Sequence, residues 1–119
     1  MKFVIDTNIL ISALLKKSVT REILLLDSFE FLLPEFALEE IEVHKDYISR
    51  RSGLNREELD VILSILLENI AIIPFSEIKS NLKKADKIMG GIDPLDAPFV
   101  ALALSVVKRG DRSILLSFS

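Results

Sequence analysis

Short, uninterrupted apolar runs alternate with longer amphipathic stretches along this chain. The runs are too short for helices and rich in β-branched and aromatic residues, which predicts strands buried on both faces. They cover residues 3–5, 29–33, 70–73 and 113–117. Two helical stretches are predicted in each interval between the runs. Strands joined by helical crossovers predict an α/β fold with a mostly parallel central sheet and helices on both faces.

Capping residues place the starts of several predicted helices. Thr7 or Asn8 is expected to cap the first helix, because short polar side chains satisfy the free amides of a first turn. Asn55, followed three residues later by Glu58, is a plausible capping box. Ser76 is expected to cap a helix that ends near residue 89, before two consecutive glycines.

Composition limits the classes of protein that this chain can belong to. At 119 residues it is expected to form one domain, residues 1–119. Cysteine is absent, and no signal peptide or apolar run of membrane-spanning length is evident, so a cytoplasmic protein without a membrane partner is predicted. Half of the residues are hydrophobic and the mean hydropathy is +0.39, which suggests self-association as a homodimer.

Four carboxylates stand at positions that suggest a functional site. Asp6 directly follows the first strand, and ligands of open α/β sheets bind outside the carboxyl ends of the strands. Asp93 and Asp96 stand at the start of an Ala- and Leu-rich stretch that is predicted to be a buried helix. Glu40 lies within the apolar arc of another predicted helix, where a carboxylate is costly to bury unless it is paired or bound to a cation.

The arc around Glu40 follows from placing residues 35–51 on a helical wheel at 100° per residue. Its apolar and aromatic members, together with one histidine, are Phe36, Ala37, Ile41, Val43, His44, Tyr47 and Ile48. His44 is expected to be a packing residue rather than a metal ligand.

Carboxylates that converge on one crevice would repel one another unless a cation lay between them. Oxygen donors, with no Cys and a single His in the chain, favour Mg²⁺ or Mn²⁺ over zinc. Purely structural roles stay open at this point: Asp6 and Asp96 as helix caps, Asp93 as a turn residue, and Glu40 as a carboxylate that extends to solvent.

Basic residues form a second, weaker pattern. Lys79, Lys83 and Lys87 recur every four residues, and Arg50-Arg51 form a pair. Either group could meet the phosphates of a nucleic acid, although a solvated helix face is the preferred interpretation of the lysine stripe.

Three segments together resemble the PIN domain family. They are residues 3–10 (FVIDTNIL), 38–41 (LEEI) and 93–104 (DPLDAPFVALAL). The resemblance covers nearly the whole chain in the expected order. It implies a three-layer α/β/α fold with four to five strands and, in most members, a metal-dependent ribonuclease. Many members are toxins of prokaryotic toxin–antitoxin pairs.

The resemblance also implies roles for individual residues. Asp6, Glu40 and Asp96 would be the catalytic, metal-binding carboxylates, and Asp93 would be a supporting ligand. Asn8, Ser12 and Ser117 would be polar groups close to the metal. The implied reaction is hydrolysis of RNA phosphodiesters with Mg²⁺ or Mn²⁺, and the implied partners are an RNA substrate, an antitoxin protein and a second copy of the chain.

The sequence departs from the family pattern at its far end. A further Asp usually follows the last strand of the family, whereas the sequence here ends at Ser119, two residues after Ser117. Reduced activity is therefore one expectation, and a weak or inactive PIN-like module that binds protein or RNA is the alternative. A phosphate-accepting receiver domain is set aside, because it needs an Asp after the third strand, where Pro74 stands.

Overall fold

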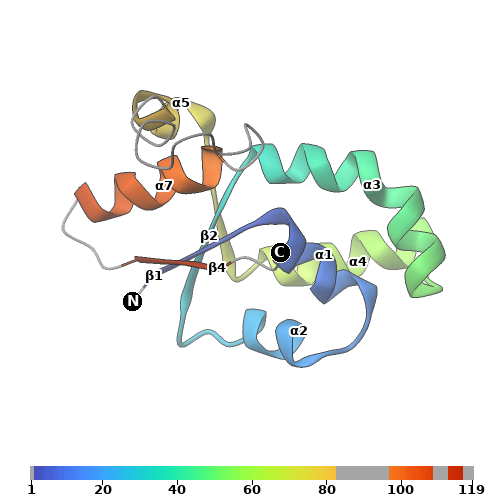
Figure 1. Ribbon diagram of the computed structural model, residues 1–119. Helices are drawn as coiled ribbons and strands as arrows, with labels where there is room; N and C mark the ends of the chain where they lie inside the picture. Colours follow the sequence, from blue (N-terminus) through green and yellow to red (C-terminus); the bar gives the residue numbers. More distant parts are fainter. Residues whose placement is uncertain (1, 83–96, 109–112, 117–119) are drawn as a thin grey trace.

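The computed structural model describes residues 2–82, 97–108 and 113–116 (Figure 1). The strands are β1 (Lys2–Ile5), β2 (Glu30–Pro34), β3 (Ile70–Ile73) and β4 (Ser113–Leu116). The helices are α1 (Thr7–Leu15), α2 (Val19–Leu24), α3 (Phe36–Ser52), α4 (Arg56–Leu67), α5 (Phe75–Ile78), the 3₁₀ helix η1 (Lys79–Asn81) and α7 (Ala97–Lys108). None of the helices in these described ranges is long and apolar enough to cross a membrane.

The strands form a parallel sheet in the order β3-β2-β1-β4. The chain therefore adds β2 and β3 on one side of β1 and then returns to place β4 on the other side. Ile5 pairs with Leu116, so β1 and β4 end at the same level of the sheet. The predicted α/β fold with a parallel central sheet is confirmed.

Alternation of side chains along the strands produces two cores, one on each face of the sheet. Ile5, Phe31 and Leu33 face the larger core, which also contains residues of α1 to α4. Val4 and Leu32 face the smaller core, where they pack with Ile78 of α5 and with three residues of α7, namely Ala101, Leu102 and Val106. Figure 1 shows α5 and α7 on one side of the sheet and α1, α3 and α4 on the other, which makes three layers.

Two of the predicted helix starts are wrong, and one is confirmed. Asp6, not Thr7 or Asn8, caps α1, because its carboxylate accepts the Ile9 amide at 2.9 Å. A single turn, α5, starts at Phe75 with Pro74 in the N-cap position, so Ser76 lies inside that turn and not before it. The capping box of Asn55 and Glu58 is present at the start of α4.

Helix α3 buries a narrower face than the wheel predicts. Ala37, Ile41 and Ile48 are buried, whereas Val43 is 78% exposed and His44 and Tyr47 are also exposed. The wheel assigned a wide arc to the core, but α3 packs chiefly along α1, so only one line of residues is covered. The expected packing role of His44 is therefore wrong.

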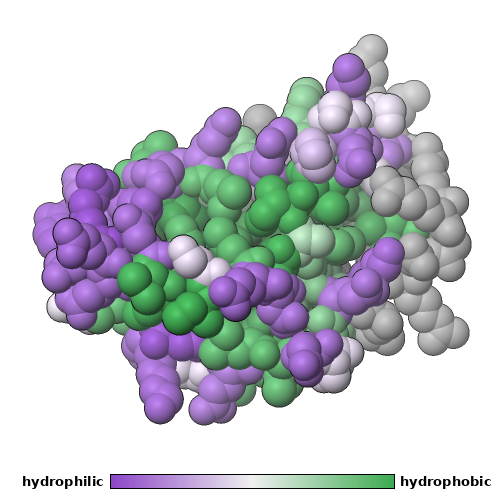
Figure 2. Space-filling view, turned by 180° about the vertical axis from the view of Figure 1, so that it is seen from behind, coloured by the Kyte–Doolittle hydropathy of each residue, from purple (hydrophilic) through white to green (hydrophobic). Residues whose placement is uncertain are grey.

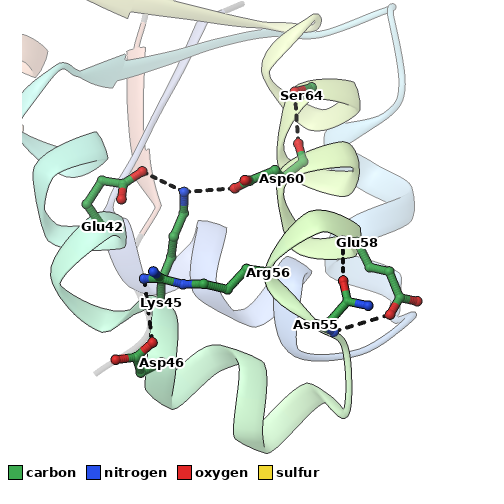
Figure 3. A network of polar contacts seen from close by, with 8 residues as sticks. All are labelled: Glu42, Lys45, Asp46, Asn55, Arg56, Glu58, Asp60 and Ser64. Carbon is green, nitrogen blue, oxygen red and sulfur yellow. Dashed lines mark hydrogen bonds and ion pairs between the residues drawn. The ribbon is translucent and has the colours of Figure 1, made fainter.

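Polar contacts hold α3 against α4 (Figure 3). The Lys45 ammonium lies 2.6 Å from the Glu42 carboxylate on its own helix and 2.8 Å from that of Asp60 on α4. A more distant pair, at 3.5 Å, joins Arg56 to Asp46. Two of these contacts, those to Asp60 and from Arg56, join α3 to α4.

Candidate metal site

Asp6 lies where β1 ends and α1 begins, and its side chain is buried, with 6% of the residue exposed. One carboxylate oxygen accepts the Ile9 amide, which fixes the side chain at the first turn of α1. The positive end of the helix dipole at this turn stabilises the negative charge of Asp6. The predicted position of Asp6, at the carboxyl edge of the sheet, is therefore observed, and the residue is a helix cap at the same time.

Glu40 is brought to this edge by a contact with the residue that follows Asp6. The Thr7 hydroxyl donates a hydrogen bond to Glu40 Oε1 at 2.5 Å, between the first turn of α1 and the second turn of α3. Thr7 is buried and Glu40 is half-buried. Since the hydroxyl is neutral, this contact orients Glu40 without cancelling its charge.

The topology adds a reason for a site at this place. The strand order reverses between β1 and β4, and ligands of open α/β sheets bind at such a reversal, outside the carboxyl ends of the strands. Asp6 follows β1 at this point. The sequence alone could place Asp6 after a strand, but only the strand order shows that this strand adjoins the reversal.

Three predicted residues, Asp93, Asp96 and Ser117, lie outside the described residues. Their roles therefore stay predictions. Within residues 2–82, 97–108 and 113–116, no three His, Asp or Glu side chains are grouped closely enough to hold a metal.

The donors that the structure does describe suit a hard divalent cation. Asp6 and Glu40 carry carboxylate oxygens on two different elements; the Ile9 amide holds Asp6, and the Thr7 hydroxyl holds Glu40. Carboxylate oxygens are the ligands that Mg²⁺ and Mn²⁺ prefer. The donor chemistry of Asp6 and Glu40 is therefore compatible with such an ion.

The two polar residues predicted to lie near the metal have different environments. Asn8 is exposed in the first turn of α1. Ser12 is half-buried and lines a cavity of about 340 Å³ between the carboxyl-terminal parts of α1 and α3, together with Leu15, Lys16 and Arg51.

Thr7 is the residue whose role sequence reasoning missed. Its hydroxyl was considered only as a helix cap, whereas the structure uses it to hold Glu40. No local pattern in the sequence signals this role, because Thr7 and Glu40 are 33 positions apart.

The fold and the site define a parallel α/β protein with acidic residues at the reversal point of its sheet. The sequence profile of the PIN domain matches residues 4–107, and the chain belongs to the PIN domain family. The recognised resemblance is thus confirmed.

A structural comparison agrees at the level of the fold. The chain is similar to one in the crystal structure of VapBC2 from Rickettsia felis bound to a DNA fragment from their promoter, with a TM-score of 0.64, 19% sequence identity and 100% of each chain covered. A search of curated protein sequences gives no match.

Proposed function

We propose that this protein is a Mg²⁺- or Mn²⁺-dependent endoribonuclease of the PIN type. Asp6, Glu40 and Asp96 would hold the metal, with Asp93 in support. The observation that carries the proposal is the Thr7–Glu40 hydrogen bond, which brings a carboxylate of α3 to the residue next to Asp6 at the reversal point of the sheet. Membership of a family of mostly metal-dependent ribonucleases supports it further.

In this mechanism the neighbours of Asp6 and Glu40 would hold the two carboxylates in fixed orientations. The cap contact with Ile9 fixes Asp6, and the Thr7 hydroxyl fixes the rotamer of Glu40, so neither carboxylate has to be ordered when substrate binds. When bound, a divalent ion would lower the pKa of a water molecule and stabilise charge on the phosphoryl oxygens.

The decisive experiment compares carboxylate variants in an RNA cleavage assay with Mg²⁺ or Mn²⁺. Asp6→Asn should lower the rate by about 100-fold or more, because even residues that only support metal ligands cost up to roughly 100-fold when they are lost. Asn is also a good helix cap, so this variant should fold normally.

Two neighbours on α3 provide the matched control. Glu40→Gln should lose activity, whereas Glu39→Gln should keep it, since Glu39 is exposed and outside the site. Equal activity of wild type and Asp6→Asn would contradict the proposal. RNA or protein binding that is indifferent to both metal and Asp6→Asn, without cleavage, would instead support the binding module.

Two protein partners are part of the proposal, an antitoxin and a second copy of the chain. The similar chain belongs to a toxin–antitoxin complex, so we propose an antitoxin as the protein partner of this chain. We also propose a homodimer, because the described part of the chain exposes large apolar side chains on several helices. They include Val19, Ile23, Val43, Val61 and Ile65.

A further inference from the structure

A cavity of about 340 Å³ lies beyond the proposed metal site, at the opposite ends of α1 and α3. Four described residues line it: Ser12, Leu15 and Lys16 from the first helix and the turn after it, and Arg51 from the last turn of α3. Two of the four are cationic, one carries a hydroxyl and none is acidic. Two full positive charges in this lining suit an anion, and they act against the partial negative charge of the carboxyl-terminal helix ends.

Lys16 and Arg51, the two cations that line this cavity, form no ion pair with the described part of the chain. The ion pairs found there involve Lys45 and Arg56, and neither Lys16 nor Arg51 takes part in one. Arg51 lies 5.9 Å above the Tyr47 ring, a contact that holds the guanidinium in place without neutralising it.

Other residues complete the helix ends beside the cavity. Arg21 donates to the carbonyls of Ala13, at 2.6 Å, and Leu14, at 3.3 Å, at the end of α1. The Gly53 amide donates to the Ser49 carbonyl at the end of α3. Capping of these two helices therefore does not depend on Lys16 or Arg51.

The cavity lies at the far end of the two helices, α1 and α3, that begin beside the proposed metal site. Thr7 contacts Glu40 near the start of both helices, and Lys16 and Arg51 line one cavity near their ends, so α1 and α3 run side by side in the same direction. At 1.5 Å per residue, Lys16 lies roughly 14 Å along α1 from Thr7. A single strand of a few nucleotides spans such a distance.

We infer that this cavity is a phosphate subsite, in which Lys16, Arg51 and the Ser12 hydroxyl hold a backbone phosphate of the RNA a few nucleotides from the bond to be cleaved. The inference rests on the proposed ribonuclease function for its substrate. Basic grooves that follow the backbone are a common way to bind single strands without reading their sequence.

The test measures RNA binding without cleavage. In the Asp6→Asn background, Lys16→Gln and Arg51→Gln should each weaken binding of an eight-nucleotide single-stranded RNA about fivefold, by fluorescence anisotropy. Each should also lower the slope of log affinity against log salt by about 0.7, the value for one phosphate contact to a single strand. The effect should be the same for different RNA sequences.

The matched controls are Lys17→Gln and Arg50→Gln, which remove neighbouring exposed cations that do not line the cavity. They should change the affinity less than twofold. Equal losses in controls and variants would overturn the subsite. So would variants that weaken binding of inorganic phosphate, titrated by NMR, but leave RNA affinity unchanged, because the cavity would then serve free phosphate.

The two proposals fail separately. A wild-type protein that shows the expected binding pattern but cleaves no RNA contradicts the enzyme and leaves the subsite standing. Normal cleavage with no difference between the variants and their controls contradicts the subsite alone.

Discussion

Thr7 is the residue that links Glu40 to the turn after β1. Its hydroxyl is the contact that connects the α3 carboxylate, Glu40, to the end of β1. Orienting partners of this kind are important in metal sites, because they fix the geometry of the ligands before the ion arrives.

Replacement of Thr7 tests this role directly. Thr7→Val keeps the shape of a side chain that is only 6% exposed, but removes the hydrogen bond to Glu40. We expect Mn²⁺ affinity, measured by calorimetry, to fall by roughly 10- to 100-fold. Thr7→Ser retains a hydroxyl and should stay close to wild type; an unchanged affinity in Thr7→Val would show that Glu40 needs no such support.

The positions of single residues could be predicted from the sequence where a local pattern marks them. Asp6 follows a short apolar run, and a carboxylate that ends a buried strand can be recognised without a structure. Glu40 was selected through an apolar arc that proved too wide, because Val43, His44 and Tyr47 are exposed. The wheel shows which residues share a side of a helix, but not how much of that side a neighbour covers.

The elements α3 and α4 are joined by a lysine whose charge lies between two acids (Figure 3). Hydrogen bonds to Asp60 and then to Glu42 raise the pKa of Lys45 above its ordinary value of 10.5. Lys45 is only 12% exposed at its side chain, whereas both acids are more than half exposed, so solvent screens much of the attraction.

Lys45→Met should lower the free energy of unfolding by about 1 kcal/mol at neutral pH, measured by chemical denaturation. Because the folded pKa is raised, the stabilisation is fully present below pH 10.5 and is lost as pH rises through the folded pKa. The difference between wild type and variant should therefore shrink in strongly alkaline solution.

The control for this prediction is the exposed pair of Arg56 and Asp46, whose charged atoms lie 3.5 Å apart. Arg56→Gln should change the free energy of unfolding by less than about 0.5 kcal/mol. If Lys45→Met were equally silent, the packing of α3 on α4 would not depend on the lysine.

At the scale of the whole molecule, the most evident surface feature is apolar. Figure 2 shows a broad area of hydrophobic side chains on the face turned away from the view of Figure 1, bordered by polar residues. Large exposed apolar patches commonly mark interaction surfaces, because leaving them in water is unfavourable.

We accordingly expect the purified protein to be a dimer at micromolar concentration. Static light scattering gives the mass directly, and the dimer should have twice the 13.4 kDa of the chain. Dilution should not release monomer until well below micromolar concentration. A monomeric mass at micromolar concentration would contradict the dimer. The apolar surface would then be assigned to binding of the proposed antitoxin.

The sequence by itself determined the order of the elements, the parallel α/β class, the PIN resemblance and the choice of Asp6 and Glu40. These properties depend on local patterns, since a few neighbouring residues reveal a strand, a cap or a motif. The roles of Asp93, Asp96 and Ser117 also come from the sequence, and they stay predictions because these residues lie outside the described ones.

The tertiary structure alone decided what lies beside what. It placed β4 next to β1, so that Asp6 adjoins the reversal of the sheet, and it joined Thr7 to Glu40 across 33 positions of the chain. It also brought Lys16 and Arg51 to one cavity. Such contacts between distant segments depend on how whole elements pack, and no local pattern of apolar and polar residues specifies that packing.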